Sequence, residues 1–186
     1  MKISEILNSI FFPRKTEYNS DEKDYLVHVD KNVNVGIRMF IASNNSPTIL
    51  FFHANAEITH EYDDIAQMYN KYNINFIVSG YRGYGLSNGQ PSMDTSLEDS
   101  LKIFDFVLDH LKSLKNKNHL VVMGRSLGST SASHLMLKRE QEIDGAIIDS
   151  GFATEYPFLL RFGLDPEEIN FSLSDGFDNL KKIKYF

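Results

Sequence analysis

Two patterns of hydrophobic and polar positions follow one another along the chain. Residues 25–29 and 34–42 alternate polar and apolar side chains, which predicts two antiparallel strands joined by a turn. From residue 48 onward, short and almost continuous apolar runs predict strands that are buried on both faces. These runs are TILFF (48–52), INFIVSG (74–80), HLVVMG (119–124) and GAIIDS (145–150).

Segments with helical spacing separate these apolar runs. One helix is predicted after a capping box formed by Thr95 and Glu98, and another over 127–139. A third is predicted over 58–72, with its apolar face formed by Tyr62, Ile65, Ala66, Tyr69 and Tyr72.

Strands and helices that alternate in this way predict an α/β fold, with a mostly parallel central sheet and helices on both faces. Ligands of such sheets bind at the carboxyl ends of the strands. Four segments are expected to meet at that edge: 53–57, 81–87, 124–128 and 149–152.

The segment GRSLG (124–128) carries the strongest chemical signal. It fits G-x-S-x-G and stands between a buried strand and a helix, which is the setting of a nucleophile elbow. Ser126 is therefore the predicted nucleophile. The alternative is an ordinary glycine-flanked turn between a strand and a helix.

A second loop, FFHANAE (51–57), also joins a buried strand to a helix. An oxyanion hole needs two backbone N–H groups that point at the developing negative charge. We expect one from Leu127 and the other from Asn55, with Ala54 next to it. The alternative is a plain loop in which Asn55 caps the following helix.

Three motifs, HANAE (53–57), GYRGYGLSNGQPS (80–92) and GRSLGS (124–129), stand in the order found in serine hydrolases. Over essentially its whole length the chain resembles small α/β-hydrolase-domain proteins. The resemblance implies hydrolysis of esters, thioesters or sometimes amides, without a metal or an organic cofactor. Ala54 stands where these proteins usually have glycine.

The resemblance also suggests residues around the pocket. Tyr81 and Tyr84 are expected to shape its floor, and Arg82 to bind carbonyl groups of the loop. His53 holds the loop in similar proteins, and Arg125 precedes the nucleophile.

No histidine of the chain is well placed to act as the base for Ser126. His134 follows eight residues later on the same helix, about 12 Å away along the axis, and so cannot reach it. His53 is the one histidine expected near the serine, where it holds the loop; a role as an unorthodox base is the minor alternative. Asp149 is a weak candidate for the acid, because it ends the strand after the elbow.

In the proteins that the chain resembles, the acid follows one more strand, which would begin near KIKYF (182–186). We therefore interpret residues 1–186 as one α/β-hydrolase domain that lacks its last strands. About 60 further residues, two strand–helix units, would hold the acid and the histidine. Without them, little or no turnover is expected, and the strand at Gly145–Ser150 becomes an apolar edge to which a second copy could pair as a homodimer.

Composition narrows the functional classes. The chain has 42% hydrophobic residues, a net charge of −6 and no basic block, which argues against nucleic acid as a partner. It has no cysteine, which excludes disulfides and thiol catalysis, and we expect no metal site. No apolar run is long enough to span a membrane, and a cytoplasmic location is expected. An apolar face at the N-terminus that touches a membrane is an alternative, formed by Ile3, Ile6, Leu7, Ile10 and Phe11.

The substrate is indicated only in outline. Apolar residues are frequent in 154–175, where such enzymes often have a lid, which favours an apolar acyl group. These residues would equally serve to pack on the core. The predicted function is hydrolysis of an ester or thioester through an acyl-enzyme on Ser126. The alternative is a non-catalytic protein of the same fold that binds an acyl ligand or a partner.

Overall fold

The structure is a computed structural model that describes residues 3–184. A six-stranded sheet with the order β1-β2-β4-β3-β5-β6 forms its centre. The first hairpin is antiparallel, β2 also pairs antiparallel with β4, and the remaining pairs are parallel. The strands are β1 (Asp24–Asp30), β2 (Val33–Phe40), β3 (Thr48–Phe52), β4 (Asn75–Ser79), β5 (Leu120–Arg125) and β6 (Gly145–Asp149).

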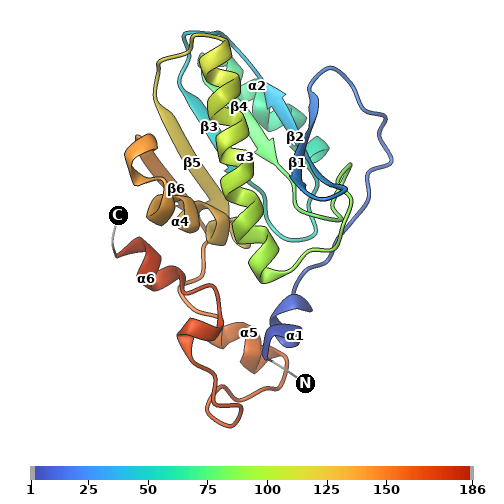
Figure 1. Cartoon of the computed structure of the whole chain (residues 1–186), viewed down its shortest axis with the longest axis vertical. Helices are drawn as coiled ribbons and strands as arrows, with labels where there is room; N and C mark the ends of the chain where they lie inside the picture. Colours follow the sequence, from blue (N-terminus) through green and yellow to red (C-terminus); the bar gives the residue numbers. More distant parts are fainter. Residues whose placement is uncertain (1–2, 185–186) are drawn as a thin grey trace.

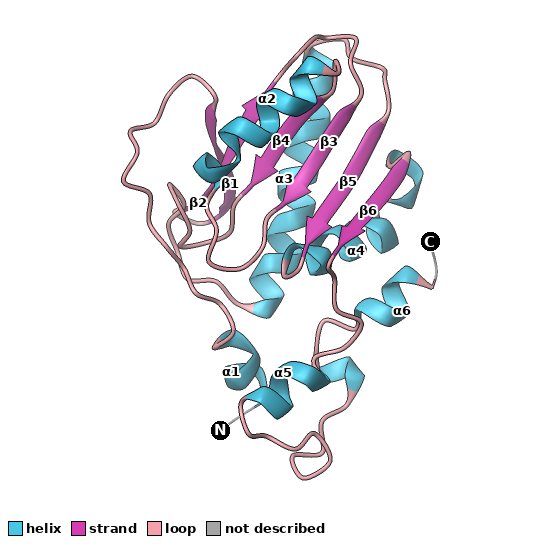
Figure 2. Cartoon of the chain, turned by 180° about the vertical axis from the view of Figure 1, so that it is seen from behind, coloured by secondary structure: helices cyan, strands magenta, loops and turns pink. Residues whose placement is uncertain are grey.

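Helices cover both faces of the sheet. Figure 1 shows α3 (Met93–Ser113) across one face, and Figure 2 shows α2 (Asp63–Lys71) on the opposite face. Strand β3 explains the two layers, because its alternate side chains enter different cores: Leu50 packs in the cluster with α3, and Phe51 in the cluster with α2. The predicted α/β architecture is therefore confirmed. The other helices are α1 (Ile3–Asn8), α4 (Gly128–Lys138), α5 (Tyr156–Arg161) and α6 (Asn179–Ile183).

Two details of the predicted helices are wrong. The cap of α3 is Ser92, whose side chain accepts from the Thr95 N–H while Thr95 Oγ1 accepts from the Ser92 N–H, so Glu98 takes no part. The helix predicted over 58–72 starts with a 3₁₀ turn (Thr59–Tyr62) and ends at Lys71. Ile65 and Tyr72 are 41% and 80% exposed, because only the Tyr62–Ala66 side of the helix reaches the sheet.

A third apolar cluster joins the two ends of the chain. Ile6 and Leu7 of α1 are buried against Leu159 of α5 and Phe171. This packing buries Ile6 and Leu7 of the apolar face considered as a membrane contact, and Phe11 is buried in the main core. The side chain of Ile3 lies outside the described residues. Figure 1 shows α1 and α5 together at one end of the molecule.

Strand β6 is the edge of the sheet in the described residues, with Ile147 and Ile148 at 41% and 36% exposure. Pairing of a second copy with this edge stays a prediction. The strand expected near KIKYF does not begin there, because Lys182 and Ile183 belong to α6; Tyr185 and Phe186 lie outside the described residues.

Helix α6 packs on α4 through a polar contact. Ser133 Oγ donates to Asn179 Oδ1 at 2.9 Å. Beside it, burial, together with the charges of Lys182, Lys138 and Arg139, lowers the pKa of half-buried His134 to about 4.

This low pKa predicts a loss of stability in mild acid. The unfolded state takes up a proton on His134 near pH 6.5, whereas the folded state does so only near pH 4, so the free energy of unfolding falls as pH drops between these values. We expect a loss of about 2 kcal/mol, less than the full shift implies, because the ring keeps some contact with solvent. Urea unfolding at several pH values measures it. His134→Gln should flatten the dependence, and an unchanged slope in that variant would contradict the assignment.

Candidate active site

The carboxyl ends of the parallel strands point to the end of the molecule where α1 and α5 lie (Figure 2). The loops after β3, β5 and β6 therefore meet there, as the strand order predicts. The serine motif stands between β5 and α4.

Ser126 has the backbone conformation of a nucleophile elbow. Its φ is +50°, a left-handed value that non-glycine residues rarely adopt. The turn is held by its neighbours: the Ser126 N–H donates to the Asp149 carbonyl at 2.9 Å, and the Ser126 carbonyl accepts from the Ser129 N–H at 3.0 Å and from Ser129 Oγ at 2.6 Å. Strain of this kind is common where a side chain must be presented for function.

Two backbone N–H groups beside the serine are free to bind an anion. Within residues 3–184, neither the Leu127 N–H nor the Asn55 N–H donates to another group of the protein. Both residues line the same pocket as Ser126. The Ala54 N–H, in contrast, donates to Glu57 Oε2 at 2.8 Å, so Ala54 does not supply an oxyanion donor.

The Asn55 side chain does not cap a helix. Its Oδ1 accepts from the Phe12 N–H at 3.0 Å and from the Tyr84 hydroxyl at 2.7 Å. The alternative prediction, that Asn55 caps the following helix, is therefore wrong.

The pocket at Ser126 has a volume of about 370 Å³ and a mostly apolar lining. Its size falls in the range of small-molecule sites. The segment 154–175 supplies part of its wall through α5, while Leu159 on the other side of α5 packs in the core. The lining residues are Ile10, Phe12, Asn55, Ser126, Leu127, Phe152, Phe158, Arg161 and Phe162.

His53 lies behind the oxyanion loop and does not line this pocket. Its ring is fully buried against Tyr81, at 4.9 Å between ring centres, and Nδ1 lies 2.7 Å from the Ala54 carbonyl oxygen. Burial lowers the pKa of His53, which keeps the imidazole neutral. This arrangement makes His53 a support of the loop, and the prediction that it lines the pocket is wrong.

Tyr81 and Tyr84 support the same loop from below. The Tyr81 hydroxyl donates to the His53 carbonyl at 2.8 Å, and Tyr84 is 1% exposed with its hydroxyl on Asn55. Neither tyrosine is part of the pocket lining. They position the loop that carries the Asn55 N–H rather than form the floor.

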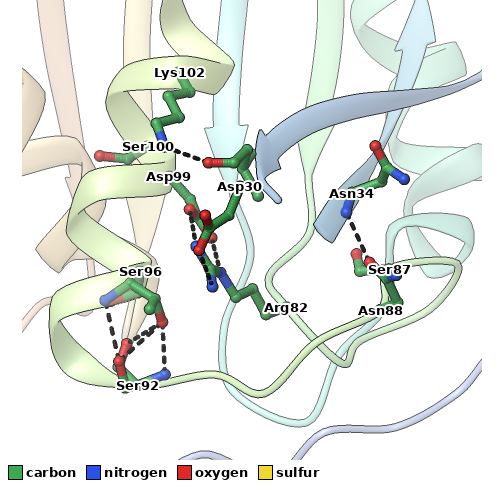
Figure 3. A network of polar contacts seen from close by, with 12 residues as sticks. Asp30, Asn34, Arg82, Ser87, Asn88, Ser92, Ser96, Asp99, Ser100 and Lys102 are labelled. Atoms are coloured by element: carbon green, nitrogen blue, oxygen red, sulfur yellow. Dashed lines mark hydrogen bonds and ion pairs between the residues drawn. The ribbon is translucent and has the colours of Figure 1, made fainter. Parts of the chain in front are cut away.

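Arg82 does not line the pocket at Ser126. Its guanidinium donates twice to Asp99 of α3, at 2.7 and 2.9 Å, and lies 3.3 Å from Asp30 (Figure 3). The predicted partners were loop carbonyls, and the observed partners are carboxylates. The pair fastens the loop after β4 to α3, which corrects the placement of Arg82 in the pocket.

Arg125 and Asp149 form an ionic group with Glu57 at the outer rim. Arg125 lies 3.4 Å from Glu57 Oε1 and 3.6 Å from Asp149 Oδ2. The Asp149 carboxylate also accepts from Ser150 Oγ and contacts no histidine of the described chain. Arg125 does not line the pocket.

Sequence reasoning missed Glu57, Ile10 and Phe12. Glu57 ends the HANAE motif, and an acidic residue so close to the oxyanion loop was a usable signal. Ile10 and Phe12 gave no such signal, because they reach the pocket only through the tertiary fold.

A strained serine after a parallel strand, with free N–H groups and an apolar pocket beside it, defines the site of a serine hydrolase on an α/β-hydrolase fold. The family model for serine aminopeptidase S33 matches residues 43–159, and the chain belongs to this family.

Relatives and solved structures agree with this assignment. Protein bem46 of Schizosaccharomyces pombe is 28% identical over 76% of this chain and 48% of its own length. Lysophosphatidylserine lipase ABHD12 of Xenopus tropicalis is 32% identical over 68% of this chain and 34% of its own. The chain thus spans a third to a half of the length of these relatives.

A solved structure shows the same fold. A soluble variant of the monoglyceride lipase of Saccharomyces cerevisiae, in complex with a substrate analogue, superposes with a TM-score of 0.64 at 16% identity. The superposition covers 85% of this chain and 52% of the lipase. Within residues 3–184, no helix is long and apolar enough to cross a bilayer.

Proposed function

We propose that the complete protein hydrolyses a carboxylic ester, with Ser126 as the nucleophile. One observation carries the proposal: Ser126 is held at a φ of +50° at the wall of an apolar pocket, beside two N–H groups that have no acceptor within residues 3–184. The lysophosphatidylserine lipase among the relatives and the monoglyceride lipase fold support an ester with an apolar acyl chain. Thioesters are the second class of substrate that the same site would accept.

The chemistry follows from the positions of these groups. Ser126 Oγ attacks the acyl carbonyl, and the developing oxyanion accepts hydrogen bonds from the Leu127 and Asn55 N–H groups. The alcohol leaves with a proton, and water then cleaves the acyl-enzyme to release the acid and restore the serine. The attack requires a base that accepts the Ser126 proton.

No histidine of the described residues lines the pocket, so we expect this chain alone to react slowly. Loss of one member of a catalytic triad leaves a residual acceleration of about 10³–10⁴ over water, from binding and the oxyanion hole. The same observation favours a second candidate function, namely binding of an acyl ligand without turnover.

A fluorophosphonate probe tests the role of Ser126. The probe phosphonylates an activated serine, and we expect labelling of the wild-type chain at Ser126, slow but detectable by mass spectrometry. Ser126→Ala should abolish it. Ser113→Ala, the same change at the exposed end of α3, should leave it intact.

The outcomes separate the two candidate functions. Labelling that persists in Ser126→Ala removes Ser126 as the nucleophile. A wild-type chain that stays unlabelled, in this form and in a longer form that includes any further natural sequence, supports the binding function instead.

A further inference from the structure

The N-terminal segment Ile10–Lys15, here called the strap, lies across the oxyanion loop. Asn55 Nδ2 donates to the Ile10 carbonyl, and Asn55 Oδ1 accepts from the Phe12 N–H at 3.0 Å. The Tyr84 hydroxyl accepts from the same Phe12 N–H at 2.9 Å. A single amide side chain thus fastens the strap on both sides of Phe11.

The strap is fastened again at its far end. The Arg14 guanidinium donates to the Ala56 carbonyl at 2.7 Å and pairs with Glu61 at 2.9 Å. The Arg14 carbonyl accepts from the Gly85 N–H at 2.7 Å, and Lys15 pairs with Gly85 as an isolated parallel bridge. The strap therefore contacts both the loop after β3 and the loop after β4.

Contacts of α1 complete the attachment. Leu7 is buried in the cluster that contains Leu159 of α5, and Phe11 is buried in the main core. Ile10 and Phe12 are left on the pocket side, where they face the same space as Phe158 and Phe162 of the opposite wall. The pocket is thus walled by two segments that are almost 150 residues apart in the sequence.

Phe12 is the most exposed aromatic side chain of this lining, at 56%. When a ligand covers a ring that is exposed to water at the edge of an apolar pocket, the burial of the ring stabilises the complex. The same residue, Asn55, supplies a backbone N–H to the oxyanion site and holds Phe12 through its side chain. Asn55 and Phe12 line the same pocket, so an acyl group bound at that N–H occupies the space that Phe12 borders.

We propose that the strap forms one wall of the acyl-chain site and that the Phe12 ring packs against the acyl chain. This inference rests on the proposed function in taking the ligand to be an acyl group. It adds that the N-terminal segment, through Asn55, belongs to the binding site.

Fluorescence titration with dansyl-labelled undecanoic acid tests the proposal without turnover. Phe12→Ala should weaken binding about tenfold, which is the effect of losing part of one buried aromatic contact. Tyr72→Ala, which removes an 80% exposed ring at the end of α2, should change binding less than about twofold, within the scatter of surface substitutions. Equal affinities of wild type and Phe12→Ala, or equal losses in both variants, would overturn the assignment.

Asn55→Leu separates the strap from a simple contact of Phe12. It removes both hydrogen bonds of the Asn55 side chain to the strap, with Ile10 and with Phe12, and adds no charge beside the probe carboxylate, so we expect the strap to loosen and the probe to bind more weakly. Wild-type affinity in this variant would contradict the part of the proposal that assigns Asn55.

Probe binding and fluorophosphonate labelling of the wild-type chain separate this inference from the proposed function. Normal probe binding without fluorophosphonate labelling would contradict only the proposed function. Normal labelling with no effect of Phe12→Ala would contradict only the role of the strap.

Discussion

Gly128→Ala is expected to destabilise the chain more than alanine at any other glycine would. A Cβ at Gly128 would lie 2.0 Å from the Phe52 carbonyl oxygen and 2.6 Å from its carbon. Both are backbone atoms at the end of β3, so no side chain can rotate away. Helix α4 and the central strand would have to separate, with an expected loss of about 4 kcal/mol or more in the free energy of unfolding.

Urea unfolding followed by circular dichroism measures this loss. Gly145→Ala is the matched control, because its added Cβ would meet only Val121 Cγ2, at 3.8 Å. We expect the control to stay within about 1 kcal/mol of wild type. A Gly128→Ala variant with the unfolding midpoint of the control would show that α4 does not pack on β3 as closely as described.

Asp99→Ala is expected to have the second-largest effect. Asp99 is 3% exposed and accepts both hydrogen bonds from Arg82, which is itself 8% exposed (Figure 3). Removing the carboxylate leaves a guanidinium that is largely buried with only Asp30 near it. Breaking a buried ion pair in this way costs about 3–5 kcal/mol, because the remaining charge stays poorly solvated.

Asp30→Ala provides the comparison within the same network. The Asp30 side chain is 55% exposed and lies farther from Arg82, at 3.3 Å, so its removal should destabilise the chain much less than removal of Asp99. The double variant Arg82→Met/Asp99→Leu should regain much of the stability lost in Asp99→Ala, since both charges are gone. Equal losses in Asp99→Ala and Asp30→Ala would contradict the dominance of the buried pair.

Most elements of the sheet were predictable from local patterns. The runs at 48–52 and 74–80 are mostly apolar because β3 and β4 are covered on both faces, and such runs are short enough to exclude helices. The cap of α3 was assigned three residues too late, because Ser92-x-x-Thr95 forms the same reciprocal bonds as the expected box. The helical spacing places Tyr72 on the apolar face of the predicted helix, but the spacing does not show that the helix ends at Lys71.

The elbow was predictable because its requirements are local. Ser126 and Leu127 are adjacent, and Gly124 is needed within the same turn, because a Cβ there would lie 2.2 Å from the Gly128 carbonyl oxygen. The roles of His53, Tyr81 and Tyr84 were not, because whether a loop side chain faces the pocket or the core depends on what packs behind it. Arg82 shows the same point: its partner Asp99 lies on another element, and no spacing rule connects the two.

The order of strands and helices could be inferred from residues close together in the chain, where backbone conformation and burial repeat with a fixed period. The serine hydrolase class followed from the resemblance of three sequence motifs to known proteins, and the G-x-S-x-G turn gave Ser126 as the predicted nucleophile. The walls of the pocket could not be inferred in either way. Phe12 and Phe158 meet there because hydrogen bonds from Asn55 and packing between α1 and α5 hold remote segments together. Such contacts depend on the assembled core, and only the folded chain decides which side chains face the serine.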